Sequence, residues 1–556
     1  MAFRYLRLHH WHGLAFVTAC SFGSSDYNPR RDLVVAQLEA NPLLGKIPSK
    51  LRPLPRYAEI QAPHVKTAVD QQMRYLRDDF DKLLLAIERG EEVGYDSIVE
   101  DFERMKAPLE STLAVVEHLL MVNQNDPLQF AHNMCLTSVI QLNQEMAQSP
   151  TIFSGLCNIK NDTKLWKSLT STQRKVVNIQ IHDMQRNGVG FTVADKEKFN
   201  NLQMNLAHLQ AKFNSNVFKS SQGFKITLKK QTSVEGMPEL LKRSLAQNAT
   251  KEGHRMATAE AGPWVVTLDD YHPCMQHLKS RKMRQVLYQQ HKAKATTEPF
   301  NNSILIHNIL KDKQALANLL GFKNYAEFSL DSKMAPDIAT VLNLFTVLQA
   351  KALPLAQNEM AALRDFIKNQ PGGEEVAQTL MAWDIPYWSE RLKENQFQLK
   401  QEELKVYFPL DRVLQGLFAL IERLFAVRIE EVPAGQQQVW HSDVRLFYIF
   451  PSSSSSSPSS GQQTAPIAAF YLDPYCRPGR KKAGNWMNPM ATKSEVLQQN
   501  LPVAHFVLNI SPPLTKEEPA LLTLDEVETL FHGNEYCDGD MKTYTQLAIL
   551  ADCVFK

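Results

Sequence analysis

Apolar residues recur every three or four positions through most of the chain, which is the spacing of one face of an α-helix. Thr192 and Asp195 have the spacing of a helix-capping box and precede the most regular of these stretches. That stretch carries Phe199, Leu202, Leu206, Leu209, Phe213 and Val217. Similar patterns predict helices over 62–92, 97–124, 127–149 and 163–188. Residues 55–220 are therefore expected to form a stack of long antiparallel helices.

The pattern changes in the second half of the chain. Helical periodicity continues over 276–368, is interrupted at Asn369–Gly373 and resumes over 410–426. β-Branched and aromatic residues then predict three strands, which are 439–450, 467–472 and 503–510. The serine-rich stretch Ser452–Ser460 is expected to be a flexible insertion in a hairpin, or an artefact of gene prediction. The predicted fold is mainly α, with a small β element near 438–510.

Composition narrows the class of protein. The chain has 556 residues, 44% of them hydrophobic, so several folded domains are expected rather than disorder. Its 61 basic and 59 acidic side chains nearly cancel, which argues against a nucleic-acid partner. No run of about 18 apolar residues predicts a membrane span. The seven cysteines form no CxxC pair and are odd in number, so a reducing compartment is expected rather than a disulfide framework.

Residues 1–40 are predicted to be a leader segment. The first 25 residues contain Arg4 and Arg7 but no acidic residue, a composition typical of organelle-targeting peptides. His9, His10 and His12 are interpreted as part of this cationic leader rather than as a metal site. A weak secretory core and a lipoprotein-like cleavage site at Cys20 are the alternatives. The predicted location is an organelle, with the mitochondrial matrix first and a plastid or the cytoplasm as alternatives.

Candidate chemistry lies near the C-terminal end of the printed sequence. Thr523 and Glu526 form a capping box, and the helix that follows ends in His532. A zinc peptidase needs two histidines at i and i+4 on one helix face, with a glutamate at i+1 as general base. The chain has Gly533 and Tyr536 at those two positions. Substitute ligands would be Glu535, Cys537 and Asp538, but Gly533–Asn534 has the character of a helix end, which would scatter them.

The remaining charged and histidine-bearing segments are interpreted as structural. The sequence contains no P-loop, no GxGxxG after a strand and no GxSxG. A basic cluster consists of Arg477, Arg480, Lys481 and Lys482, and it is expected to be a solvated turn rather than a nucleic-acid patch. His441 and His505 lie in predicted strands and are expected to be hydrogen-bonded structural histidines rather than zinc ligands.

Ordered blocks of sequence from about residue 41 to 532 resemble the thimet oligopeptidase family of zinc peptidases, and within it the oligopeptidase A-like members. No single block carries the resemblance, which rests on their number and order. The blocks are Asn41–Leu44, Leu319–Ala326, Lys333–Ala335, Tyr387–Trp388, Tyr407–Leu410, Val413–Leu414, Gly416–Phe418, Val439–His441, Asp443–Arg445, Phe470–Asp473 with Tyr475, Arg477–Gly479, Leu521–Thr523 and Asp525–His532.

The resemblance implies a two-lobed helical peptidase fold around a deep channel that admits short peptides. It implies one zinc ion, with His532 as its first ligand. The sequence departs from the family after His532, because the catalytic glutamate, the second histidine and a downstream glutamate ligand have no counterpart in 533–556. These residues are interpreted as unrelated sequence joined by splicing, a frameshift or a gene-model error, so the fold is expected to be incomplete at the C-terminus.

Two functions follow as hypotheses. The first is a zinc metalloendopeptidase that hydrolyses short peptides. Under this hypothesis the chain itself is expected to be inactive and to bind no zinc stably. No catalytic residue is assigned, and the substrate-binding residues are unknown. The alternative is a non-catalytic helical protein that binds peptides or acts as a scaffold. The predicted domains are 41–275, an N-terminal helical domain, and 276–556, an incomplete catalytic domain. A complete chain is expected to be a monomer, whereas exposed apolar faces at 410–425 and 524–531 predict poor solubility.

Overall fold

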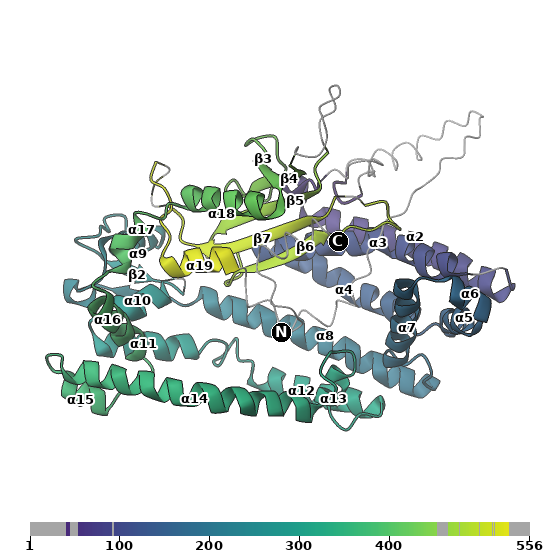
Figure 1. Cartoon of the computed structure of the whole chain (residues 1–556), viewed down its shortest axis with the longest axis horizontal. Helices are drawn as coiled ribbons and strands as arrows, with labels where there is room; N and C mark the ends of the chain where they lie inside the picture. The colour runs from purple at the N-terminus through teal and green to yellow at the C-terminus, as the bar shows by residue number, and fades with distance from the viewer. Residues whose placement is uncertain are drawn as a thin grey trace. The chain divides into compact units, whose positions relative to one another are not determined.

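The computed structural model describes residues 41–44 and 54–532, except 92–93, 269, 453–464, 478, 500, 514 and 516. The leader predicted at 1–40 lies outside the described residues. The chain divides into two compact units (Figure 1), of which the first comprises 1–207, 415–510 and 529–556 and the second 208–414 and 511–528. The predicted boundary at residue 275 falls inside the second unit, and the division into 41–275 and 276–556 remains a prediction.

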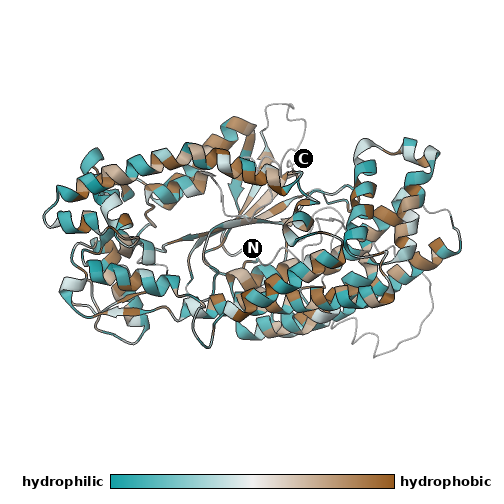
Figure 2. Ribbon diagram, turned by 90° about the horizontal axis from the view of Figure 1, so that it is seen from below, coloured by the Kyte–Doolittle hydropathy of each residue, from teal (hydrophilic) through white to brown (hydrophobic). Residues whose placement is uncertain are grey.

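Long amphipathic helices build the first part of unit 1, as the periodicity predicts. Hydrophobic and hydrophilic residues alternate along their ribbons (Figure 2), so each helix can bury one side. The capping box at Thr192 is present, since its hydroxyl accepts a hydrogen bond from the Asp195 backbone N–H at 3.2 Å. The helices are α2 (Ala62–Glu88), α3 (Asp101–Val122), α4 (Asp126–Ala147), α5 (Pro150–Asn161), α6 (Thr163–Ser168), α7 (Ser171–Arg186) and the first half of α8 (Val193–Gln222), whose second half belongs to unit 2, with short turns at η2 (Tyr57–Glu59) and η3 (Asp96–Glu100).

The single helix predicted over 163–188 is wrong, because the chain forms two helices there. Leu169 leaves the helical conformation, and Thr170 starts α7 with a capping box in which Thr170 and Gln173 exchange side-chain-to-backbone hydrogen bonds. A threonine hydroxyl competes well for free backbone N–H groups, so it favours a new helix start over continuation. Periodicity alone did not reveal this break.

A five-stranded mixed sheet forms the rest of unit 1 and confirms the small β element. Its spatial order is β3-β4-β5-β7-β6, and β5 pairs with β7 in parallel while the other neighbours are antiparallel. Ile449 of β4 pairs with Ala468 of β5, so the strands that flank the serine-rich stretch are indeed paired. The strands are β3 (Val427–Glu431), β4 (Arg445–Pro451), β5 (Ala468–Tyr475), β6 (Trp486–Ala491) and β7 (Val503–Ile510).

Strand prediction was right for β7 and incomplete elsewhere. Residues 439–444 form a loop rather than the start of a strand. β3 follows α18 (Leu410–Phe425) almost directly, so the sequence shows no turn signal between them. β6 contains Pro489, which lacks a backbone donor and argues against a strand. β6 is the last strand in the spatial order, where a missing donor is tolerated.

Both faces of the sheet are covered within unit 1. On one face, Phe418 of α18 makes edge-on ring contacts with Phe447 at 5.1 Å and Phe470 at 6.1 Å between ring centroids. On the other face, Tyr471 meets Tyr57, which belongs to the helical core. The sheet and the helices α2–α7 therefore share one hydrophobic core, although they are far apart in sequence.

Unit 2 is also mainly helical and has its own core around Trp264 and Leu245, which are 1% and 0% exposed. Asp384 is fully buried and binds two guanidinium groups, Arg281 at 2.8 Å and Arg284 at 3.0 Å. Its elements are β1 (Ile226–Leu228), η4 (Gln231–Ser233), α9 (Glu239–Lys251), β2 (Trp264–Val266), α10 (Tyr271–His277), α11 (Arg281–Lys292), α12 (Ser303–Leu319), α13 (Tyr325–Leu330), α14 (Ile338–Lys368), α15 (Gly373–Gln378), α16 (Ile385–Phe397) and α17 (Gln401–Lys405), followed by the first part of α18 and most of α19 (Leu524–His532).

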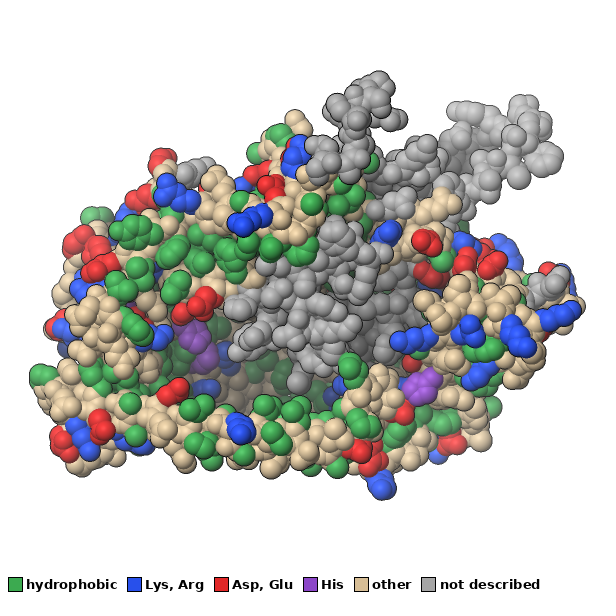
Figure 3. Space-filling view, in the orientation of Figure 1, with side chains coloured by type: hydrophobic (Ala, Val, Ile, Leu, Met, Phe, Trp, Pro, Cys, Tyr) green, Lys and Arg blue, Asp and Glu red, His purple; other side chains and the backbone are tan. Residues whose placement is uncertain are grey.

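Helix α14 is long and largely uncovered. Its first two-thirds is exposed on every side, and hydrophobic side chains are visible along it at the lower edge of Figure 3. The exposed side chains include Leu342, Leu344, Phe345, Val347, Leu348, Leu353 and Leu355. Among the described residues, α14 is the one helix long and apolar enough to cross a membrane, although the sequence predicted none. Length and composition alone do not separate a spanning helix from a core helix.

Candidate functional site

The helix that ends in the predicted zinc ligand begins as expected. The Thr523 hydroxyl accepts a hydrogen bond from the Glu526 backbone N–H at 3.1 Å, and the Glu526 carboxylate accepts one from the Thr523 backbone N–H at 2.7 Å. This exchange confirms the capping box. α19 runs to His532, which is the last described position and whose side chain is not described. Gly533, Glu535, Tyr536, Cys537 and Asp538 lie outside the described residues.

A short bridge within unit 2 fixes the start of α19. Pro409 pairs with Leu521, and backbone hydrogen bonds of 2.9 Å join Leu410 to Ala520 and Leu522 to Phe408. Leu522 is completely buried. The segment that leads into α19 is therefore held to the start of α18 before the helix begins. This arrangement positions a helix without itself providing a reactive group.

The described residues do not fit a zinc ion. A catalytic zinc takes three protein ligands from nitrogen, oxygen or sulfur donors and leaves one position open. No group of three or more histidine, cysteine, aspartate or glutamate side chains is arranged to hold a metal in the described part of the chain. His532 as a zinc ligand therefore remains a prediction. No chemical step through a metal is derived from these residues.

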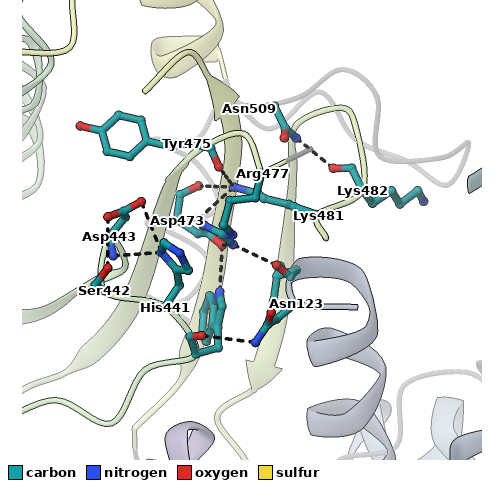
Figure 4. Close-up of polar contacts among 12 residues, drawn as sticks. Asn123, His441, Ser442, Asp443, Asp473, Tyr475, Arg477, Lys481, Lys482 and Asn509 are labelled. Carbon is teal, nitrogen blue, oxygen red and sulfur yellow. Dashed lines mark hydrogen bonds and ion pairs between the residues drawn. The ribbon is translucent and has the colours of Figure 1, made fainter. Parts of the chain in front are cut away.

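The strongest polar cluster lies in unit 1 and centres on Asp473 of β5 (Figure 4). Its buried carboxylate accepts hydrogen bonds from the Trp440 indole at 2.8 Å, the Lys481 ammonium at 2.9 Å and both terminal nitrogens of Arg477 at 2.8 and 2.5 Å. Lys481 also donates to the backbone oxygen of Tyr475 at 2.7 Å. The cluster thus ties the end of β5 to the loop that follows it.

Electrostatics explain why these charges tolerate burial. Burial alone would raise the pKa of Asp473, but the hydrogen bonds from Arg477 and the charges of Lys481 and Arg477 outweigh it, so this pKa is lowered. Burial lowers the pKa of Lys481 to about 8, and the facing carboxylate opposes that shift. One carboxylate shared by two cations leaves the group charged and paired. Such a cluster is built for stability rather than proton transfer.

This cluster corrects one interpretation of the sequence. Arg477 and Lys481 do not belong to a solvated turn, because the Arg477 side chain is 10% exposed and that of Lys481 is 0% exposed. Arg480 and Lys482 are exposed. The basic stretch therefore splits into two structural cations and two surface cations. Sequence spacing could not show this, because the partner carboxylate comes from the preceding strand.

A second buried group lies beside this cluster, and its member His118 has no signal in the sequence. His118 of α3 stacks on His505 of β7 with ring centroids 3.6 Å apart. Tyr57 and His505 share a hydrogen bond of 2.7 Å, which confirms His505 as a structural histidine. Burial lowers the pKa of His505 to about 3 and holds the pKa of His118 well below its usual value. His441 is also engaged as expected, accepting a hydrogen bond from the Asp443 backbone N–H at 3.3 Å.

Comparison with known families gives two matches that together cover most of the described chain. Residues 274–534 match the profile described as peptidase family M3. Residues 73–197 match the N-terminal domain described for neurolysin and thimet oligopeptidase. Both matches agree with the resemblance that the sequence blocks carry.

Individual relatives are longer than this chain. The chain is 33% identical to an organellar oligopeptidase A of Arabidopsis thaliana, named as chloroplastic and mitochondrial, over 89% of the chain and 60% of that relative. It is also 33% identical to a probable cytosolic oligopeptidase A of the same plant, over 89% of the chain and 68% of that relative. Oligopeptidase A of Escherichia coli is 28% identical over 86% of the chain and 68% of its own length.

Proposed function

Since the chain belongs to peptidase family M3, we propose that it derives from a zinc metalloendopeptidase that hydrolyses short peptides. The observation that carries this proposal is the family match over residues 274–534, which runs through α19 and includes His532. The names of the relatives, oligopeptidase A in both plant and bacterium, support short peptides as the substrate class. His532 is the proposed first zinc ligand.

We further propose that the 556-residue chain itself lacks peptidase activity. Gly533 stands where a general-base glutamate is needed, and Tyr536 stands where a second histidine is needed. A single histidine does not fix a catalytic zinc, and no base is then present to activate its bound water. The test measures bound zinc and cleavage of a quenched-fluorescence peptide of bradykinin size, with E. coli oligopeptidase A as positive control. Stoichiometric zinc with chelator-sensitive turnover would overturn this proposal.

A repair experiment tests whether restoring the HExxH motif is enough for zinc binding and turnover, or whether a further zinc ligand is also missing. The double substitution Gly533→Glu and Tyr536→His restores HExxH in the sequence. We expect weak zinc binding at most and no useful turnover, because a third protein ligand is also required. Adding His532→Ala to the double variant is the matched control and should abolish the weak binding. Efficient cleavage by the double variant would show that the present residues supply the remaining ligand.

The alternative function is a non-catalytic protein that binds peptides or acts as a scaffold. The observation that favours it is the combination of two retained helical units with Gly533 and Tyr536 in the motif. Transcripts sequenced across the codons for Phe531 to Asn534 separate the two functions. A transcript that continues after His532 into a glutamate and a second histidine favours the enzyme. If only the printed sequence is transcribed, the binding protein is favoured.

Location and domain division complete the proposal. We propose targeting to an organelle, the mitochondrial matrix first, because of the leader composition and the name of the organellar relative. A plastid and the cytoplasm are the alternatives, in keeping with the chloroplastic and mitochondrial name of one relative and the cytosolic name of the other. Residues 1–40 fused to a fluorescent protein test this, and a diffuse cytosolic signal would contradict it. The family match that starts at residue 274 supports a domain boundary near 275.

A further inference from the structure

An open groove lies on the side of α7 that faces away from the unit 1 core. α7 buries Val177 and Ile181 in that core. The opposite face lines the groove at positions three or four residues apart between Ser171 and His182, and Trp166 of α6 adds an aromatic side chain. The groove has a volume of about 660 Å³. Ligand sites span about 300–1,000 Å³, so this groove has room for a ligand that lies along the helix.

The groove is basic, and its two strongest cations are not neutralised by the protein. Arg174 and Lys175 lie in its wall, and no ion pair joins either of them to an acidic side chain in the described part of the chain. No aspartate or glutamate is among the residues that line the groove. From Thr163 to Arg186 the chain carries five lysines and arginines but one aspartate, and basic side chains gather over α6 and α7 at the right of Figure 3. The groove should therefore attract an anionic ligand.

Apolar surface in the same groove narrows the class of anion. Ile179 is 40% exposed, and Trp166 is half-buried and presents part of its ring to the groove. A phosphate backbone would lose hydration against Ile179 without gaining a partner there, whereas a peptide can offer acidic and apolar side chains together. The groove runs roughly 16 Å from Ser171 to His182 at 1.5 Å per helical residue. That is the length of an extended peptide of about five residues.

We propose that this groove binds short acidic peptides in an extended conformation. Acidic side chains of the peptide pair with Arg174 and Lys175, and an apolar side chain packs on Trp166 and Ile179. The proposal adds a peptide class to the binding function described above. It requires neither zinc nor His532, because the groove is built from α6 and α7 of unit 1, so the two proposals can fail separately.

The test measures the fluorescence anisotropy of a fluorescein-labelled peptide, Glu-Glu-Leu-Phe-Glu, titrated with the 556-residue chain at low ionic strength. A chelator is present, so that binding is measured without cleavage. The matched peptide Gln-Gln-Leu-Phe-Gln keeps the apolar side chains and removes the charges. We expect saturable binding of the acidic peptide and about tenfold weaker binding of the neutral one, because two surface ion pairs are lost.

Three outcomes of this titration would overturn the proposal. Equal binding of the two peptides would exclude recognition of acidic side chains. No saturable binding of the acidic peptide up to about 1 mM would exclude the site. Tighter binding of a labelled thymidine oligonucleotide of the same length would assign the groove to nucleic acid rather than to a peptide.

Matched variants locate the binding in this groove. Arg174→Gln with Lys175→Gln removes both cations, whereas Lys229→Gln with Lys230→Gln removes an adjacent exposed pair in unit 2. We expect about tenfold loss of affinity for the first pair alone, without a lower melting temperature, because no ion pair within the protein is lost. Equal losses would show a general charge effect and contradict the assignment. Ile179→Ser should weaken binding roughly fivefold by removing an apolar contact, and unchanged affinity would exclude the apolar half of the site.

Discussion

Helices α2 and α14 are of similar length and carry similar periodic apolar residues, yet their surroundings are opposite. α2 buries Val65, Val69 and Phe80 almost completely against other helices of unit 1. α14 buries Leu363 and Ile367 near its C-terminal end and exposes its earlier apolar residues. An apolar stripe therefore shows that a helix can be covered, but its neighbours decide whether it is covered. The predictions below test how far this contrast between the unit 1 core and α14 extends.

The largest effect is expected where the unit 1 core contains charge. Asp473→Asn keeps the shape of the side chain but leaves Lys481 and Arg477 buried without a carboxylate. Removing one partner of a buried ion pair costs about 3–5 kcal/mol. Glu431→Gln is the matched control, because its pairing with Arg445 at 2.6 Å lies near the surface and should be worth at most about 1 kcal/mol. Urea denaturation measures both, and equal losses would contradict the assignment of Asp473 as a core anchor.

The same apolar deletion on the two helices addresses the comparison directly. Leu76 of α2 is 2% exposed and Leu344 of α14 is 55% exposed. Leu76→Ala should cost about 2–5 kcal/mol, since it removes buried surface and leaves a cavity. Leu344→Ala should change the free energy of unfolding by about 0.5 kcal/mol or less. A loss of several kcal/mol from Leu344→Ala would show that α14 is covered in solution.

Acid should destabilise unit 1 through its buried histidines. His505 has an ordinary pKa near 6.5 when unfolded and about 3 when folded, so only the unfolded chain takes up its proton as pH falls between these values. Its contribution to stability is complete above pH ~6.5 and decreases at about 1.4 kcal/mol per pH unit below it. Urea midpoints measured from neutral to mildly acidic pH should show this slope. His505→Gln should flatten it, and an unchanged slope would exclude His505 as its source.

The smallest effect on unfolding is expected from charges placed on α14, although their effect on association should be clear. Replacing Leu344, Leu348 and Leu355 with lysine breaks up the exposed apolar surface, which promotes association. We expect the wild-type chain to form oligomers at micromolar concentration and the triple variant to shift toward monomer in light scattering. Leu85→Lys on α2, at a 49% exposed position, is the single-site control. A monomeric wild-type chain would contradict this prediction.

Local patterns predicted local structure well. The capping pairs Thr192–Asp195 and Thr523–Glu526 marked two helix starts, and β7 was predicted at its observed bounds. β6 was missed because Pro489 is compatible only with an edge position, which is a property of the whole sheet. The Asp473 cluster was missed for the same kind of reason, since Trp440 comes from the loop before β4 whereas Arg477 and Lys481 come from the loop after β5. His532 stays a predicted zinc ligand that rests on the family resemblance, because Gly533 and Tyr536 break the motif and lie outside the described residues.

Unit 1 is built from segments that lie far apart along the chain, so its parts are synthesised at different times. Tyr57 and His505 share a hydrogen bond although 448 positions separate them along the chain. At about 5–20 residues per second, the ribosome adds the second partner roughly 20–90 seconds after the first. For most of that interval, until β3 to β6 have been made, the apolar residues of α3 that later contact the sheet have no strands to cover them. Nascent unit 1 must therefore hold this surface away from other chains until its last strand has been made.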